Sequence, residues 1–90
     1  MKSSWFVYIL RCADDTLYTG VTVDVTRRMK EHNEGGVKSA KYTRHRRPIT
    51  LMYQESCQDR STACKREAAI KKLSRAAKLK LIATTNPINE

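Results

Sequence analysis

The sequence lacks the long apolar runs and the paired cysteines that mark membrane or secreted proteins. No stretch reaches about 18 apolar residues, so we expect no membrane-spanning helix. The apolar stretch near the N-terminus ends at Arg11 and is too short for a signal peptide. The only cysteines are Cys12, Cys57 and Cys64, and no C-x-x-C pair occurs. This odd set favours reduced thiols in the cytoplasm over a disulfide scaffold, and we expect no structural zinc site.

Acidic residues are also scarce. Eighteen Lys and Arg stand against nine Asp and Glu, which gives a net charge of +9 and a pI near 9.8. The cations cluster in residues 38–47, which contain no acid, and in residues 60–80, where Glu67 is the single acid. Clustered cations bind polyanions because counterions are released, although such clusters are also common on solvated helix faces. We therefore expect a nucleic acid as partner.

The hydrophobic pattern predicts a small α+β fold with the element order ββαβαα. Ninety residues suit one domain, which we expect to span residues 1–90. The predicted strands cover residues 5–12, 17–22 and 49–55. Because the first two strands form a hairpin, we expect the three strands to form a mainly antiparallel sheet that is flanked by about three helices.

Local signals place the helices and the third strand. Asp24 can cap a helix over residues 25–33, which Gly35-Gly36 would end. Residues 37–47 form a basic loop or a short helix. The alternation of Ile49, Leu51 and Tyr53 predicts that these three side chains share one face of the third strand. Two more helices are expected. The first begins at Asp59 or Ser61, and the second holds Ala76, Ala77, Leu79 and Ile82.

Two tyrosines, Tyr8 and Tyr18, lie in the predicted hairpin strands. Tyrosine is commonly a packing residue in strands, but its hydroxyl can accept a proton from water beside a metal or an arginine. If only Asp14 and Asp15 form the turn, the two side chains point to opposite faces of the sheet. Joint catalysis therefore predicts a connection of odd length or a bulge.

Three charged or polar residues of the predicted helices could act on a phosphate. Glu67 has apolar neighbours one turn before and after it, so it either pairs with a cation of the chain or binds a metal ion. Arg28 and His32 lie four residues apart on one helix face. An arginine can bind phosphate oxygens in a bidentate manner, and at this point Arg27 is an equal candidate.

In combination these residues resemble the GIY-YIG nuclease family. The half-motifs correspond to Phe6-Val7-Tyr8, which departs from Gly-Ile-Tyr at two positions, and Tyr18-Thr19-Gly20, which has threonine for isoleucine. Arg28 follows Tyr18 by ten residues, the spacing of the catalytic arginine of the family, and this resemblance favours it over Arg27. His32 is similar to a histidine often found four residues later, and Glu67 to the metal-binding glutamate.

The chain is most similar to short, single-domain bacterial members, whose basic segment resembles K-Y-T-R-H-R-R-P at residues 41–48. The resemblance implies one divalent ion, Mg²⁺ or Mn²⁺, held by Glu67, and catalysis by Tyr8, Tyr18, Arg28 and His32. It implies DNA as the favoured substrate and no small-molecule cofactor, and we expect a monomer. Asn86, or alternatively Asn89, corresponds to a late asparagine of the family. The expected nucleic-acid contacts are Lys38, Lys41, Tyr42, Arg44, Arg46, Arg47 and Asn86.

Three functions are compatible with these residues. The first is a metal-dependent endonuclease that cleaves phosphodiesters of DNA. The second is a nucleic-acid-binding module that has the same basic surface but no turnover. The third is a basic factor associated with the ribosome or another protein, which would prefer structured RNA. Cleavage in Mg²⁺, compared with a Glu67→Ala control, separates the first from the others.

Overall fold

The fold was analysed in a computed structural model, which describes residues 4–34 and 41–85. Its elements are β1 (Trp5–Arg11), β2 (Leu17–Thr22), α1 (Val25–Glu34), α2 (Lys41–Arg44), β3 (Thr50–Cys57), α3 (Arg60–Lys71) and α4 (Arg75–Thr85). The predicted α+β class and the order ββαβαα are confirmed, and α2 is an additional short helix within the basic segment. No helix in the described ranges is long and apolar enough to cross a membrane.

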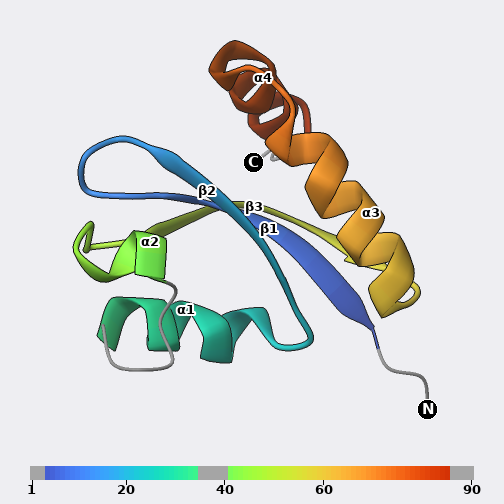
Figure 1. The fold of residues 1–90 in the computed structure, drawn as a ribbon, viewed down its shortest axis with the longest axis horizontal. Helices are drawn as coiled ribbons and strands as arrows, with labels where there is room; N and C mark the ends of the chain where they lie inside the picture. Colours follow the sequence, from blue (N-terminus) through green and yellow to red (C-terminus); the bar gives the residue numbers. More distant parts are fainter. Residues whose placement is uncertain (1–3, 35–40, 86–90) are drawn as a thin grey trace.

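The three strands form one antiparallel sheet in the order β2-β1-β3, so β1 is the central strand. Helices α1 and α2 lie on one side of this sheet, and α3 and α4 lie on the other (Figure 1). β2 is an edge strand, and α3 packs against it as well as against β1. The edge formed by β2 is therefore bordered by helices from both sides.

Each face of β1 supports its own hydrophobic cluster, because successive side chains of a strand point to opposite faces. Val7 and Ile9 pack with Ala63 and Ile70 of α3. Tyr8 and Leu10 belong to the second cluster, against which Met29 of α1 and other residues pack.

The predicted alternation in the third strand is wrong at one position. Ile49 and Leu51 pack with Leu10 on the α1 side, whereas Tyr53 packs in the cluster on the α3 side. The cause is a register shift, since Ile9 pairs with Tyr53 but Leu10 pairs with Leu51. Such a bulge places one extra residue in β3 and reverses the facing of the side chains on either side of it.

Two aspartates begin the long helices as the sequence predicts. The carboxylate of Asp24 accepts a hydrogen bond from the backbone N–H of Arg27 at 3.0 Å. Asp59 is the N-cap of α3, and its carboxylate accepts from the N–H of Thr62 at 2.8 Å. Both bonds satisfy N–H groups that have no partner within the helix. The predicted helix end at Gly35-Gly36 lies outside the described residues.

The hairpin loop, residues 12–16, connects several parts of the fold. Asp14 accepts a hydrogen bond from Nε of Arg46 at 3.0 Å, and the backbone N–H of Ala13 donates to the carbonyl of Arg46 at 2.8 Å. Asp15 adopts a positive φ of 69° and binds Arg75, whose guanidinium donates to its carbonyl at 2.7 Å and to its carboxylate at 3.1 Å. The loop thereby holds both the segment after α2 and the start of α4.

Candidate functional site

The two tyrosines share the face of the sheet that α1 covers. Leu10 lies opposite Tyr18, and Tyr8 lies opposite Gly20. Residues 12–16 connect the strands, so the loop has five residues and the predicted odd length is confirmed. Gly20 is required by the ring of Tyr8, because a Cβ at position 20 would lie 2.5 Å from Oη and 2.6 Å from Cζ. The ring therefore lies across the edge strand.

His32 is fully buried between Tyr8 and α2. Its Nε2 is 3.1 Å from Oη of Tyr8, and its Nδ1 is 2.7 Å from Oγ1 of Thr43. The edges of the Tyr8 and Tyr18 rings also pack against it, with centroid distances of 5.9 and 5.6 Å. Burial lowers the pKa of His32 from 6.5 to about 4, and the charge of Arg28 adds to this effect. The imidazole is therefore neutral at pH 7 and acts on a substrate only through its neighbours.

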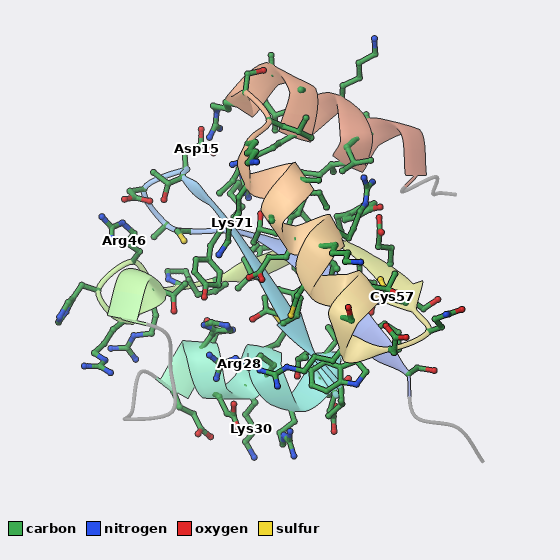
Figure 2. The ribbon with its side chains drawn as sticks, turned by 45° about the vertical axis from the view of Figure 1, so that its right-hand side comes forward. Asp15, Arg28, Lys30, Arg46, Cys57 and Lys71 are labelled. Atoms are coloured by element: carbon green, nitrogen blue, oxygen red, sulfur yellow. The ribbon has the colours of Figure 1, made fainter. Side chains whose placement is uncertain are left out.

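Arg28 lies on the sheet side of α1, whereas Lys30 points away from the sheet (Figure 2). Its guanidinium forms an ion pair with Glu31 at 2.8 Å and its side chain is 24% exposed. Burial raises the pKa of Tyr8, and a hydrogen bond with Arg28 opposes this rise. The competing candidate, Arg27, is 61% exposed. Arg28 is thus the arginine that contacts the tyrosine site.

Glu67 extends from α3, the helix that lies on the other side of the sheet (Figure 1). It lies between Ala63 and Ile70, the two buried residues of that helix. Its negative charge contributes to the raised pKa of Tyr8, although burial and Arg28 have larger effects. The carboxylate pairs with Nζ of Lys71 at 3.1 Å, and its side chain is 22% exposed. Both alternatives for this residue therefore remain open, because its carboxylate is paired with a cation of the chain and its partial exposure leaves it accessible to a metal ion.

The residues fit a magnesium-type site better than a preformed zinc centre. Within the described parts of the chain, no group of three or more His, Cys, Asp or Glu could hold a metal ion. Mg²⁺ needs only one or two carboxylates when phosphate oxygens and water complete its octahedron. Glu67 is partly exposed and satisfies this smaller requirement, provided that Lys71 gives up its ion pair.

The basic segment has structural bonds that the sequence did not predict. Arg47 donates to the carbonyls of Asn33 and Glu34 at 3.1 and 3.2 Å, at the end of α1 where a cation is favoured. Arg46 pairs with Asp14 in the hairpin loop. Lys41, Tyr42 and Arg44 lie in α2, but only the backbone of Lys41 and Tyr42 is described. Lys38, Asn86 and Asn89 lie outside the described residues.

A pocket of about 550 Å³ lies at this end of α1. Its lining residues are Asn33, Arg44, His45, Arg47 and Pro48. The lining contains two arginines and no acid, so the pocket is suited to an anion such as a backbone phosphate. It does not include the tyrosines or Glu67, and it therefore adds a contact surface rather than a second chemical centre.

Sequence reasoning missed two partners of the site residues, and it expected a cation beside Glu67 without naming which one. Thr43 binds His32, Glu31 binds Arg28, and Lys71 binds Glu67. The spacings of Arg28 to Glu31 and of Glu67 to Lys71 are three and four residues, so helix periodicity alone could have indicated both pairs. Thr43 had no such signal, because its contact with His32 spans a segment without a predicted structure.

Comparison with known proteins agrees with this geometry. Residues 4–80 match the family described as the GIY-YIG catalytic domain. A UPF0213 protein of Desulfotalea psychrophila is 56% identical over 81 residues, which cover 90% of this chain and 73% of that protein. A UPF0213 protein of Staphylococcus aureus is 51% identical over 79 residues, which cover 88% of this chain and 94% of that protein.

Two solved structures are also similar. The solution NMR structure of a UPF0213 protein from Bacillus halodurans is 40% identical, with a TM-score of 0.60, and the match covers 94% of this chain and 88% of that one. The solution NMR structure of a protein from E. faecalis is 34% identical, with a TM-score of 0.60, and the match covers 99% of this chain and 96% of that one. Because the family match covers most of this chain, the chain belongs to the GIY-YIG family.

Proposed function

We propose that this chain is a divalent-metal-dependent endonuclease that hydrolyses phosphodiester bonds of DNA. The family to which it belongs is a nuclease family, whose members act on nucleic acids and generally depend on a divalent metal. The proposal for this chain is supported by one observation above the others. Tyr8, Tyr18 and Arg28 lie on one face of the sheet, and the charge of Glu67 reaches Tyr8 from the opposite side.

Arg28 supplies positive charge to the phosphate. Cleavage of a phosphodiester places additional negative charge on the phosphate oxygens, and a fixed guanidinium stabilises that charge more in the transition state than in the ground state. Glu31 and Tyr8 hold the guanidinium, while 24% of its side chain remains exposed. The arginine is therefore oriented before the substrate arrives.

Glu67 is the proposed ligand of Mg²⁺ or Mn²⁺. When bound, such an ion polarises the scissile phosphate and stabilises the leaving oxygen. Glu67 extends from α3 between two buried residues, so its helix fixes its position relative to the sheet. Lys71 shields the carboxylate through an exposed ion pair, which is of the weak kind that a divalent ion can displace.

Tyr18 is the more accessible of the two tyrosines, because it is partly exposed and Tyr8 is only 2% exposed. We assign to Tyr18 the contact with the attacking water. Tyr8 binds both Arg28 and His32, so it holds the arginine and connects the histidine to the site. His32 assists from within the protein, as its complete burial requires.

The basic surface binds the DNA backbone. The net charge of +9 favours a polyanion, and the arginine-lined pocket at the end of α1 offers a place for a phosphate beside the site. Lysines of α3 and α4 are exposed on the other side of the sheet, among them Lys65 and Lys80. We expect the chain to act as a monomeric single domain in the cytoplasm, with a preference for DNA over RNA.

The test is cleavage of supercoiled and branched DNA in Mg²⁺ by the wild type, Glu67→Gln and Glu34→Gln. Glu67→Gln removes the proposed metal ligand, so cleavage should fall to background, and EDTA should have the same effect on the wild type. Glu34 is exposed at the end of α1 and its substitution should leave the rate unchanged. Equal rates for wild type and Glu67→Gln would contradict the proposal, and faster cleavage of structured RNA would contradict the substrate.

A binding module without turnover is the second candidate. It is favoured by the ion pairs of the site, since Arg28 and Glu67 are neutralised by Glu31 and Lys71. This function predicts DNA affinity that EDTA does not change and that falls about 10³- to 10⁵-fold between 50 and 200 mM salt for six to ten phosphate contacts. A cleavage rate above that of Glu67→Gln would contradict it.

A further inference from the structure

A chain of three buried polar side chains runs from α2 to the site. Thr43 and His32 are fully buried, and Tyr8 is 2% exposed. Oγ1 of Thr43 is 2.7 Å from Nδ1 of His32, and Nε2 of His32 is 3.1 Å from Oη of Tyr8. Burying polar groups is costly unless they are bonded to each other, so a chain of this kind fixes the orientation of every member.

The direction of the hydrogen bonds follows from Arg28, the residue at which this series of bonded side chains ends. A guanidinium has only donors, so in its bond with Tyr8 the phenolic oxygen accepts. The single hydrogen of the hydroxyl group is then free to bond Nε2 of His32. A neutral imidazole whose Nε2 accepts carries its hydrogen on Nδ1, and Oγ1 of Thr43 is the acceptor next to it.

We propose that Thr43 is a positioning residue for the cleavage reaction, and this inference rests on the proposed function. By accepting the hydrogen of Nδ1, its hydroxyl group selects the His32 tautomer whose Nε2 accepts from Tyr8. Tyr8 in turn presents its oxygen to Arg28, which neutralises the phosphate. Thr43 therefore acts on the substrate through three intervening residues and does not contact it.

The surroundings of Thr43 are suited to this role, because α2 is held from two sides. Arg47 binds the last carbonyls of α1, and Arg46 binds Asp14 in the hairpin loop. α2 also packs against α1, the helix that carries His32 and Arg28. Four residues cannot form a stable helix alone, so these bonds determine where the Thr43 hydroxyl lies.

The first test uses the tautomer of His32, which can be measured without any substrate. Long-range ¹H–¹⁵N correlation spectra at pH 7 should show the hydrogen on Nδ1 in the wild type and in Thr43→Ser. Thr43→Val keeps the shape of the side chain but removes the acceptor, so the Nε2–H tautomer should gain population. A wild type with its hydrogen on Nε2, or a Thr43→Val protein with an unchanged tautomer, overturns the proposal.

The second test measures steady-state cleavage over a range of substrate concentrations. Thr43→Val should lower kcat about 10- to 100-fold, the usual range for loss of a group that orients a histidine, with KM unchanged. Thr43→Ser should restore most of the rate. Thr19→Val is the matched control, because Thr19 is also a buried threonine but lies on the α3 side of the sheet, and it should cleave like the wild type.

The outcomes separate this inference from the proposed function. If the wild type cuts no faster than Glu67→Gln, the proposed function fails. The tautomer of His32 then still decides whether Thr43 orients the hydrogen-bonded side chains of His32 and Tyr8. If the wild type cuts and Thr43→Val cuts equally well, the proposed function stands and the role of Thr43 is refuted. A loss of rate that Thr43→Ser does not restore would show that packing, rather than the hydroxyl, matters.

Discussion

Substitution of Gly20 by alanine should destabilise the protein, against the usual trend for strands. Alanine in a strand is normally favoured over glycine by roughly 0.5–1 kcal/mol, because glycine loses more conformational entropy on folding. Here the new Cβ would lie 2.5 Å from Oη and 2.6 Å from Cζ of Tyr8, whose burial leaves it little room to move. Overpacking of this kind costs about 1–3 kcal/mol, so we expect a net loss of about 1–2 kcal/mol.

A double-mutant cycle in urea identifies the cause of that loss. Leucine at position 8 lacks the outer ring atoms that approach Gly20, so in a Tyr8→Leu background Gly20→Ala should become neutral or stabilising. The coupling between the two positions should therefore exceed about 1 kcal/mol, and Gly20→Ala alone should lower Tm by about 4–8 °C per kcal/mol. Effects that add within about 0.5 kcal/mol would refute the explanation from the tyrosine ring.

Three further predictions concern buried and paired groups. Because the folded state disfavours protonation of His32, whose pKa falls from 6.5 to about 4, stability measured in urea should decline by roughly 3 kcal/mol as pH drops from 7 to 4. His45→Gln should show the same loss of stability. If His32→Gln also showed it, the attribution of this loss to His32 would be contradicted. Thr19 has a buried hydroxyl without a partner among the described residues, so Thr19→Val should gain about 1–3 kcal/mol in thermal unfolding, and an unchanged Tm would argue against it. Lys71→Gln should free Glu67 and lower the Mg²⁺ concentration for half-maximal cleavage about two- to fivefold, and a similar shift in the neighbouring Lys72→Gln would attribute it to general charge.

Much of the fold follows from short-range signals in the sequence. Alternation in the hairpin strands and the caps Asp24 and Asp59 depend on residues a few positions away, and the structure agrees with them. The bulge in β3 could not be predicted, because it depends on how β3 pairs with β1 some forty residues earlier. Alternation predicts the facing of Tyr53 only while the register is unbroken.

The candidate site was predictable in its members but not in their contacts. The resemblance selected Arg28 over Arg27, and in the structure Arg28 is the less exposed of the two, with side-chain exposures of 24% and 61%. Complete burial of His32 was hidden, since a histidine within a polar helix is typical of an exposed face. Its partner Thr43 lies in a segment whose positive charges indicate nucleic-acid binding rather than a role in the core. In addition, a four-residue helix has too few turns to show a periodic pattern.

The central strand has a consequence for how this chain can change over time. In β1, Tyr8 and Leu10 face α1, and Val7 and Ile9 face α3, so a single strand serves the chemistry and the core at alternate positions. Substitutions can adjust either face separately. Insertion or deletion of one residue within β1 would exchange the two faces, moving Tyr8 away from His32 and an aliphatic side chain into its place. Selection should therefore tolerate varied residues in this strand but hold its length constant.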